Sequence, residues 1–344
     1  MKRTDFSVDW LFAACAPDTE LLPWNAQFTP VDLPHDWQIR HADDLYRDGT
    51  LFYRKYFFVT DVPGTRRMLW FGGAYMDTTV FVNGTEVGQW KYGYTSFWFD
   101  ITDALHEGQN EVLVRCNLRH PNSRWYSGAG LYRNVELWEA PDLHLMPDGL
   151  YVTAKEGDNG AWTVAVTAEA GSVTAASAGR TLTLHLTDDN GSLLGTAAIP
   201  ADAWAALPSP DGWRTGKETA IYKASHTFTL QDPALWDLDA PNFYHITAEL
   251  TGADGVTDTL TTRFGCRSFA IDPQKGFILN GKPYPLRGVS RHQDRPGIGN
   301  ALTAKEHTED MDLICELGAN TIRLAHYQHS QTFYDLCDER GMVV

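Results

Sequence analysis

The sequence predicts a multidomain protein in which two β-sandwiches are followed by an α/β unit with parallel strands. Three observations support this fold class. The length of 344 residues exceeds that of one ordinary domain and fits two or three. Short strand patterns separated by turn residues fill the sequence as far as Ile271. After Asp272 the pattern changes to strands that alternate with helices. We therefore divide the chain into residues 1–140, 141–271 and 272–344.

The first unit has the pattern of a β-sandwich or jelly roll. Residues 51–59 (LFYRKYFFV) are rich in aromatic and β-branched side chains, which favour a strand. Asn83-Gly84 separates two short strand patterns and is the strongest short hairpin signal. Two more strands are predicted at residues 110–118 and 133–140.

The second unit has the size and strand number of an immunoglobulin-like sandwich. Gly, Asp, Asn and Pro separate the candidate strands, and no cluster of chemically active side chains accompanies them. We expect this unit to act as a spacer. The six candidate strands are residues 151–157, 162–170, 181–189, 224–230, 243–250 and 261–271.

The third unit begins with a hairpin at Asn280-Gly281, which leads into an apolar strand that ends near Ser290. Thr303 and Glu306 have the spacing of a capping box, which marks the start of a helix. Gly318 lies where that helix is expected to end.

A second strand, a second helix and a third strand complete the pattern. Residues 321–326 (TIRLAH) form the strand, Ser330 is placed to cap the helix, and Gly341 ends it before residues 342–344. This β-α-β-α-β order predicts parallel strands with right-handed crossovers.

The composition excludes some partners. A formal net charge of -16 leaves no basic surface for nucleic acid, and it disfavours anionic membranes. Five widely spaced cysteines fit neither a disulfide framework nor a zinc site, so we expect a reducing compartment. The N-terminus has no apolar signal segment, and we expect a soluble, cytoplasmic protein.

The candidate functional residues follow the two parallel strands. In an α/β barrel the active site forms at the carboxyl ends of the strands. The first strand leads to His292 and Asp294, and the second contains Arg323 and leads to His326. Imidazoles and a guanidinium give directed hydrogen bonds, which suit a hydroxyl-rich ligand.

Each of these residues also has a structural interpretation. His292 and Asp294 fit capping roles in a loop, and Arg323 fits an ion pair with a barrel carboxylate. His326 and His329 have the spacing of a metal pair, but the sequence offers no third ligand. We therefore predict no metal site in this chain.

Ordered motifs along the whole chain resemble the N-terminal part of glycoside hydrolase family 2 enzymes, most closely the bacterial β-galactosidases. The motifs are LPHDW (33–37), YRKYF (53–57), FVNGTEVG (81–88), YGYTSFWFDIT (92–102), RWYSGAGLYRNV (124–135), LWDLDAPNFY (235–244), FGCRSF (264–269), GFILNGKPYPLRGVSRHQD (276–294) and NTIRLAHYQHSQTFYDLCDERGMVV (320–344).

The resemblance implies a jelly-roll sugar-binding domain, an immunoglobulin-like domain and the first part of an incomplete (β/α)8 TIM barrel. It also implies that His292 and His326 hydrogen-bond the sugar and that Arg323 keeps the nucleophilic carboxylate ionised. Asp294, which follows the first strand, is counted with the substrate-binding residues. A carbohydrate partner and a homo-oligomer are expected for the intact enzyme.

The resemblance also implies what this chain lacks. Family members use two glutamates on later barrel strands, so both are expected beyond Val344 and no catalytic residue is assigned here. Glu306, Glu309, Glu316 and Glu339 lie on the predicted helices rather than at strand ends. We therefore expect the chain to be an inactive fragment of a longer enzyme.

The resemblance implies Mg²⁺ and Na⁺ in the intact enzyme, but no cofactor in this chain. The family's magnesium ligands are expected beyond Val344. Some relatives have an aspartate that contacts sugar or sodium where this sequence has Asn122-Ser123-Arg124-Trp125.

Three functions remain open on sequence grounds. The first is retaining hydrolysis of terminal β-D-galactosides, and the second is the same reaction on β-glucuronides or β-mannosides. The third is a carbohydrate-binding module without catalysis, for which the aromatic stretch 92–99 would supply stacking faces. The same aromatic residues also fit a sandwich core.

Overall fold

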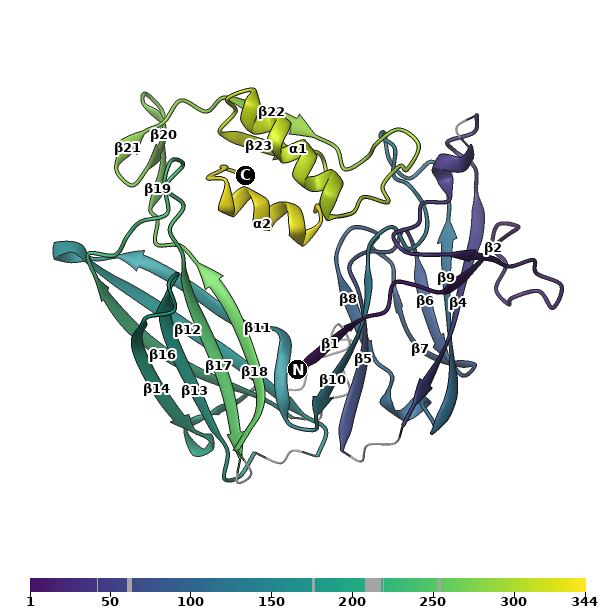
Figure 1. Cartoon of the computed structure of the whole chain (residues 1–344), viewed down its shortest axis with the longest axis horizontal. Helices are drawn as coiled ribbons and strands as arrows, with labels where there is room; N and C mark the ends of the chain where they lie inside the picture. Colours follow the sequence, from purple (N-terminus) through teal and green to yellow (C-terminus); the bar gives the residue numbers. More distant parts are fainter. Residues whose placement is uncertain (42, 61–63, 175–176, 208–217, 219, 253–254) are drawn as a thin grey trace.

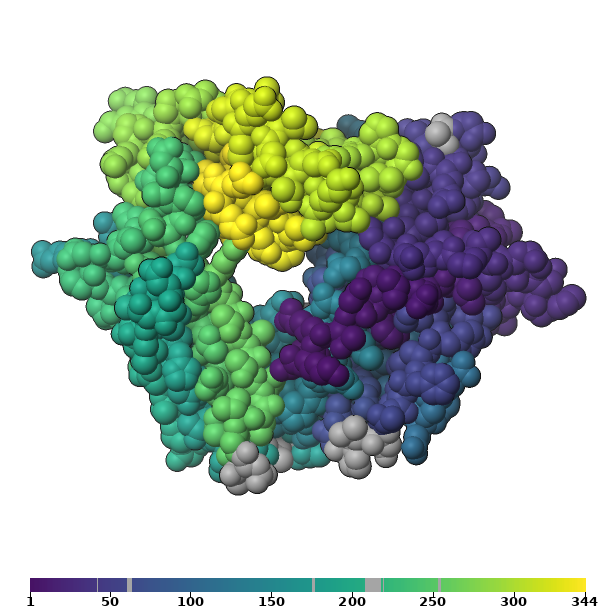
Figure 2. Space-filling view, viewed as in Figure 1, coloured from purple at the N-terminus to yellow at the C-terminus, as the bar shows by residue number. Residues whose placement is uncertain are grey.

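The structure is a computed structural model, and it describes the chain except residues 42, 61–63, 175–176, 208–217, 219 and 253–254. Two β-sandwiches stand side by side, and the C-terminal α/β unit bridges their upper ends (Figure 1). Figure 2 shows an opening between the three units. In the described part of the chain, no helix has the length and apolar character needed to cross a membrane.

The first sandwich consists of two sheets, as predicted. Strand pairs in both sheets are antiparallel. One sheet has the order β3 (Thr29–Val31), β2 (Trp10–Cys15), β4 (Gly49–Val59), β9 (Gly108–Leu118), β6 (Thr78–Val82) and β7 (Thr85–Trp90). The other has the order β1 (Lys2–Asp5), β10 (Val135–Pro141), β5 (Thr65–Phe71) and β8 (Phe97–Asp100).

The core of this sandwich follows from alternation along its strands. In β9, Val112, Val114 and Cys116 are fully buried, while the residues between them are partly exposed. This is the period of two expected for a strand with one face on the core. Asn83 and Gly84 both have positive φ, which allows the tight β6–β7 hairpin that the sequence predicts.

The second sandwich also has two antiparallel sheets. Its first sheet has the order β11 (His144–Glu156), β12 (Ala161–Ser172), β16 (Ala220–Gln231) and β15 (Ala205–Leu207). Its second has the order β14 (Leu193–Pro200), β13 (Thr181–Asp188), β17 (Tyr244–Gly252) and β18 (Gly255–Phe264). Sequence analysis missed β14 and β15, which are edge strands with few β-branched residues and much exposed surface.

The α/β unit begins with a small antiparallel sheet of β19 (Phe269–Asp272), β20 (Gly276–Leu279) and β21 (Lys282–Pro283). The predicted hairpin at Asn280-Gly281 joins β20 and β21. Then come β22 (Gly288–Arg291), α1 (Ala304–Glu316), β23 (Thr321–Leu324) and α2 (Gln331–Glu339). As predicted, β22 and β23 are parallel, and Val343 forms a further parallel bridge with Thr321.

The helix caps follow the prediction in one case and only partly in the other. At α1, Thr303 and Glu306 form the complete capping box. At α2, Ser330 occupies the N-cap position, but its side chain makes no capping hydrogen bond, so that part of the prediction is wrong. Short 3₁₀ turns lie at Gln38–His41, Thr102–Ala104, Asp158–Gly160 and Ala201–Ala203.

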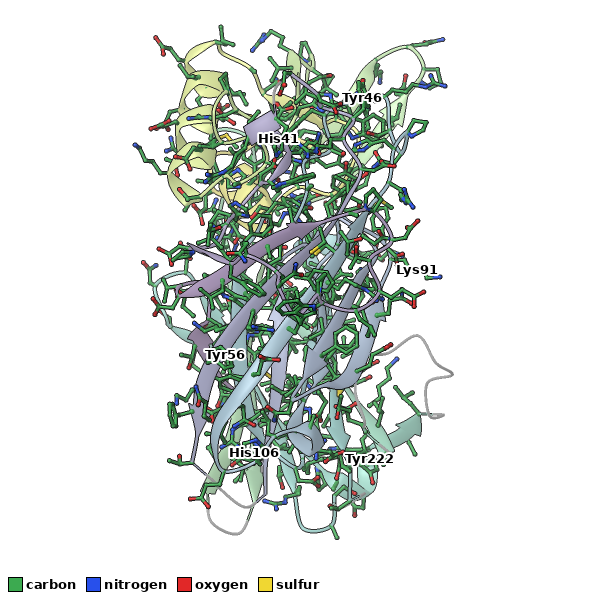
Figure 3. All side chains as sticks on the ribbon, turned by 90° about the vertical axis from the view of Figure 1, so that its right-hand side faces the viewer. His41, Tyr46, Tyr56, Lys91, His106 and Tyr222 are labelled. Carbon is green, nitrogen blue, oxygen red and sulfur yellow. The ribbon has the colours of Figure 1, made fainter. Side chains whose placement is uncertain are left out.

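The α/β unit is attached to both sandwiches. Arg263 of β18 pairs with Glu339 of α2, and the Trp236 indole N–H donates to the Asp338 carbonyl at 2.9 Å. On the other side, His41 and Tyr46 lie at the end of the first sandwich next to the α/β unit, whereas Tyr56 and His106 lie farther away (Figure 3).

Candidate functional site

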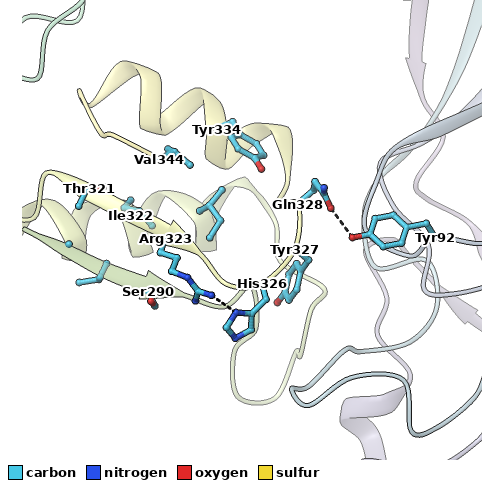
Figure 4. A pocket seen from close by; sticks show the side chains of 13 residues that line it. Tyr92, Ser290, Thr321, Ile322, Arg323, His326, Tyr327, Gln328, Tyr334 and Val344 are labelled. Carbon is cyan, nitrogen blue, oxygen red and sulfur yellow. Dashed lines mark hydrogen bonds between the residues drawn. The ribbon is translucent and has the colours of Figure 1, made fainter. Parts of the chain in front are cut away.

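A pocket of about 670 Å³ lies along the exposed face of β22 and β23 (Figure 4). The sequence places the candidate site at the carboxyl ends of these two strands, and the pocket extends along them from their first residues, Gly288 and Thr321. The lining residues are Tyr92, Gly288, Val289, Ser290, Thr321, Ile322, Arg323, Leu324, His326, Tyr327, Gln328, Tyr334 and Val344.

The strand pattern brings Arg323 into this pocket. Ile322 is buried and packs with the apolar residues of α1 and α2. Because successive side chains point to opposite faces of a strand, Arg323 lies on the other, exposed face. Ser290 is its register partner on β22.

Arg323 donates a hydrogen bond to His326 Nδ1 at 2.8 Å (Figure 4). A guanidinium can only donate, so Nδ1 is an acceptor and the neutral imidazole carries its proton on Nε2. Loss of hydration, and then the positive charges of Arg323 and His292, hold the pKa of His326 below its ordinary value. His326 is therefore a neutral ring with an N–H that is free to meet a ligand oxygen.

The structure brings His292 next to this pair. The His292 and His326 rings lie 5.1 Å apart, edge to face. His292 is half-buried, and within the described residues its Nδ1 has no hydrogen-bond partner. His292 is not among the residues that line the pocket, although its ring lies beside that of His326.

Asp294 is a predicted site residue that does not line the pocket. It is half-buried and outside the pocket lining. Burial raises the pKa of its carboxyl, and the positive charges of His292 and Arg291 act in the opposite direction.

Sequence analysis missed an aromatic wall that the first sandwich contributes. The Trp125 ring lies 5.0 Å from that of His326, and its indole N–H donates to the Tyr94 hydroxyl. Tyr94 stacks on Tyr327, and the Tyr92 hydroxyl donates to Gln328 (Figure 4). The motifs at 92–102 and 124–135 contained these residues, but no local pattern indicates that they face a distant strand end.

Arg133 anchors the loop that follows β23. This buried guanidinium donates to the carbonyls of Gly72 and Tyr94 in the first sandwich, both at 3.0 Å. It also donates to the Gln328 carbonyl at 2.7 Å. Because Gln328 is two residues beyond His326, Arg133 fixes the backbone that presents the histidine.

Asp36 makes a second attachment of the same two units. Its buried carboxylate accepts hydrogen bonds from the backbone N–H groups of Gln38, Ala129 and Asn300 and from the Tyr126 hydroxyl. Burial raises the pKa of Asp36, whereas these donors act to lower it. Asn300 belongs to the α/β unit, so this carboxylate joins the loop after β22 to the first sandwich.

The helix-covered side of β22 carries a polar cluster around Arg291. Its guanidinium pairs with Asp310, donates to His307 Nδ1 and His329 Nδ1 at 3.1 Å each, and lies 3.9 Å over the Phe333 ring. Burial, followed by the charge of Arg291, lowers the pKa of each histidine to about 3. His329 is thus held by a different arginine from His326.

The described residues contain no group of three or more His, Cys, Asp or Glu side chains that would hold a metal ion. The magnesium ligands implied by the family resemblance are expected beyond Val344, so this finding concerns the described residues alone. We derive no step through a metal.

Carboxylates near the site have structural roles. Glu306 closes the α1 capping box, Glu309 pairs with Arg295, and Glu339 pairs with Arg263. Glu316 is the last residue of α1. As predicted, all four glutamates lie on helices.

Comparison with known proteins places the chain in a family. Residues 23–141 match the sugar-binding domain of glycosyl hydrolases family 2, residues 144–267 match a second domain of that family, and residues 270–344 match its TIM barrel domain. The chain therefore belongs to glycosyl hydrolase family 2, as the N-terminal region of that architecture. These matches confirm the predicted fold class.

The relatives do not agree on a substrate. A β-galactosidase of Bacteroides ovatus is 31% identical over 100% of this chain, and the chain spans 40% of that protein. A β-glucuronidase of Bacteroides fragilis is 31% identical over 93% of the chain, which spans 48% of it. The chain thus spans less than half the length of these two curated relatives.

The similar solved structures also include both β-galactosidases and β-glucuronidases. A putative β-galactosidase from Bacteroides fragilis superposes with a TM-score of 0.88 at 28% identity, covering 99% of this chain and 52% of that one. A Bacteroides uniformis β-glucuronidase, covalently bound to cyclophellitol-6-carboxylate aziridine, superposes with a TM-score of 0.87 at 27% identity. The match covers 99% of this chain and 41% of that one. A calcium binding mutant of a β-glucuronidase from the same species superposes with a TM-score of 0.83 at 28% identity. The match covers 99% of this chain and 42% of that one.

Proposed function

We propose that the intact protein hydrolyses terminal β-D-galactosides with retention of configuration, and that this chain supplies part of its sugar-binding site. The observation that carries the proposal is the Arg323–His326 pair in the pocket on β22 and β23, in a chain that matches a glycosidase family in all three units. The galactoside assignment rests on the sequence form RLAHYQH at 323–329.

In the proposed reaction, one carboxylic acid protonates the glycosidic oxygen while a second carboxylate attacks the anomeric carbon. Water then releases the sugar from the covalent intermediate. Both carboxylates are proposed to lie in the part of the barrel that follows Val344. Retention requires them to be about 5–5.5 Å apart.

The residues of this chain have binding and electrostatic roles in that scheme. The Nε2–H of His326 donates to a ring hydroxyl, and His292, whose ring lies 5.1 Å from that of His326, forms a second hydrogen bond with the sugar in the complete site. Arg323 lies on the exposed face of its strand, where its charge stabilises an ionised nucleophile. Asp294, half-buried beside this group, accepts a hydroxyl hydrogen bond.

A β-glucuronide is the second candidate substrate. It is favoured by the relatives of that name and by the exposed guanidinium of Arg323, which would also pair with a sugar carboxylate. Hydrolysis of a β-mannoside, and carbohydrate binding without catalysis, are less directly supported.

The test is a panel of nitrophenyl β-D-galactoside, β-D-glucuronide and β-D-mannoside. It is applied to the 344-residue chain and to the protein expressed from its complete reading frame. We expect no turnover by the chain and a preference for galactoside by the complete protein. A preference for glucuronide would transfer the proposal to the second candidate, and turnover by the chain alone would show that the carboxylates are misplaced.

A further inference from the structure

A buried glutamine, Gln293, joins the loop that follows β22 to the loop that follows β23. It lies between His292 and Asp294, and only 1% of its surface is exposed. Gln293 is not among the residues that line the pocket of the candidate site. Because the chain is continuous, the contacts that hold Gln293 also hold the backbone of the two site residues on either side of it.

The backbone of Gln293 is hydrogen-bonded to the second loop. Its N–H group donates to the Tyr327 hydroxyl at 3.1 Å. Tyr327 immediately follows His326 (Figure 4), is 6% exposed and stacks on Tyr94 of the first sandwich. The stack fixes the Tyr327 ring, so its hydroxyl is an acceptor in a fixed position for the loop after β22.

The side chain of Gln293 holds the second loop at another point. Its Oε1 atom accepts a hydrogen bond from the Ser330 backbone N–H at 2.8 Å, and the Arg133 guanidinium lies 3.5 Å from the same oxygen. Both of these groups can only donate, which identifies the atom as the carbonyl oxygen of the amide. Through its backbone and its side chain, Gln293 therefore contacts both ends of the segment 327–330.

These bonds lie where the regular strand pairing has ended. The ladder between β22 and β23 ends at Arg291, whose carbonyl also accepts from the Ala325 N–H at 2.9 Å. His292 and His326 come after this point, and their rings lie 5.1 Å apart. Their relative position depends on contacts between the two loops, and Gln293 makes two hydrogen bonds across that gap.

We propose that Gln293 is a positioning residue of the candidate site, which holds His292 and His326 in the arrangement that binds the sugar. The inference rests on the proposed function, since it concerns how these histidines are presented to a substrate. Gln293 acts through the two loops and does not touch the substrate. A displacement of about 1 Å at such a site can lower a rate about a hundredfold.

The first test follows the imidazole NMR signals of His292 and His326 in the 344-residue chain. Gln293→Met keeps the size of the side chain but removes the acceptor, whereas Gln293→Glu keeps an oxygen acceptor. Tyr327→Phe keeps the stacked ring and removes the hydroxyl, and it covers a folding failure of Gln293→Met. Ile314→Val is the control, because it removes one buried carbon from the core of the same unit. We expect both signals to move in Gln293→Met and Tyr327→Phe and to stay in Gln293→Glu and Ile314→Val.

The second test measures kcat and KM in the complete protein, with the nitrophenyl glycoside that it prefers. We expect Gln293→Met to lower kcat at least about tenfold and to change KM less, because the geometry of the bound sugar is altered. Gln293→Glu should restore kcat to within about threefold of the unsubstituted protein, since the acceptor is retained. Ile314→Val should leave kcat unchanged, which separates positioning from a general loss of stability.

Unchanged imidazole signals in both Gln293→Met and Tyr327→Phe would overturn the proposal. An equal loss of kcat in Gln293→Met and Gln293→Glu would also overturn it. If the unsubstituted complete protein hydrolyses none of the glycosides, the proposed function fails. The imidazole signals of the 344-residue chain would then still decide whether Gln293 positions the two histidines.

Discussion

The rings of Tyr94 and Tyr327 stack with their centroids 4.1 Å apart and their planes 11° from parallel. Tyr94 belongs to the first sandwich, and Tyr327 immediately follows His326 in the α/β unit. The geometry of the candidate site therefore depends on how these two units dock. The Trp125 indole N–H donates to the Tyr94 hydroxyl, which extends the contact to the wall of the site.

The first prediction distinguishes the contribution of the Tyr94–Tyr327 stack to stability from that of the Tyr94 hydroxyl. Tyr94→Phe keeps the ring but removes the acceptor for Trp125, so we expect a loss of about 1 kcal/mol in the free energy of unfolding. Tyr94→Leu also removes the stack, which adds about 0.5–1.5 kcal/mol. Urea unfolding measures both. The control is Tyr92→Phe, which loses one exposed hydrogen bond, and equal stability of Tyr94→Leu and this control would refute the role of the stack.

The second prediction concerns Arg133, whose planar group joins carbonyls of two units. Arg133→Lys keeps the charge but cannot reach Gly72, Tyr94 and Gln328 together. We expect a loss of about 2–3 kcal/mol and faster hydrogen exchange at the amides of residues 328–330. Arg124→Lys is the same change at an exposed position and should alter neither quantity. Unchanged exchange in Arg133→Lys would mean that the loop has other sufficient anchors.

Local signals in the sequence predicted much of the fold. Asn83-Gly84 and Asn280-Gly281 form the expected hairpins because few other residue pairs tolerate two positive φ angles. The Thr303–Glu306 capping box forms because both partners lie within one helical turn. The parallel β22–β23 pair follows from the strand–helix alternation.

Long-range contacts were not predictable in this way. The stack of Tyr94 on Tyr327, and the placement of Trp125 beside His326, join residues more than two hundred positions apart in the sequence. Nothing in the periodicity of either segment identifies its partner. The same limit applies to Ser330, whose backbone N–H donates to the distant Gln293 side chain and whose hydroxyl does not cap α2.

The third prediction is that acid destabilises the α/β unit. His307 and His329 have folded pKa values of about 3, below the ordinary value of 6.5. Between pH 6.5 and pH 3 the unfolded state binds a proton at each histidine and the folded state does not. The free energy of unfolding is therefore highest above pH 6.5 and falls as the pH is lowered toward 3. Each histidine therefore costs about 2 kcal/mol at pH 5 relative to neutral pH.

Limited proteolysis at pH 7.5 and pH 5 tests this. We expect residues 272–344 to be the least stable part of the chain, with cleavage first in the exposed segment 281–287 and accelerated at pH 5. His329→Asn retains an acceptor for Arg291 without the titration, so its cleavage should depend less on pH. His106→Asn, at an exposed position of the first sandwich, is the control. Cleavage first near residue 141, with no pH effect, would contradict the prediction.

The last prediction tests the proposed site residues in the complete protein. His292→Ala and His326→Ala should each lower kcat/KM far more than they lower stability. A hydrogen bond that strengthens in the transition state contributes roughly 2–4 kcal/mol, which corresponds to tens to hundreds of fold in rate. His106→Ala removes an exposed imidazole far from the pocket and should change stability by about 0.5 kcal/mol or less without affecting the rate.

Arg323→Ala should behave differently from the histidine variants, because its proposed role is electrostatic. Without the guanidinium, the pKa of the nucleophilic carboxylate rises, and the acid limb of the pH profile of kcat/KM moves upward. The variant also removes the donor to His326 Nδ1, so the pKa of His326 rises in part toward its ordinary value, while the larger cause of its lowering, loss of hydration, remains. This change in the pKa of His326 occurs in Arg323→Ala but not in the Arg323→Ala/His326→Ala double variant. If the acid limb of the pH profile is shifted upward in the double variant as well, the shift belongs to the nucleophilic carboxylate. Full activity in the histidine variants, or a lower rate with an unshifted acid limb in Arg323→Ala, would show that these roles are wrong even though the family is right.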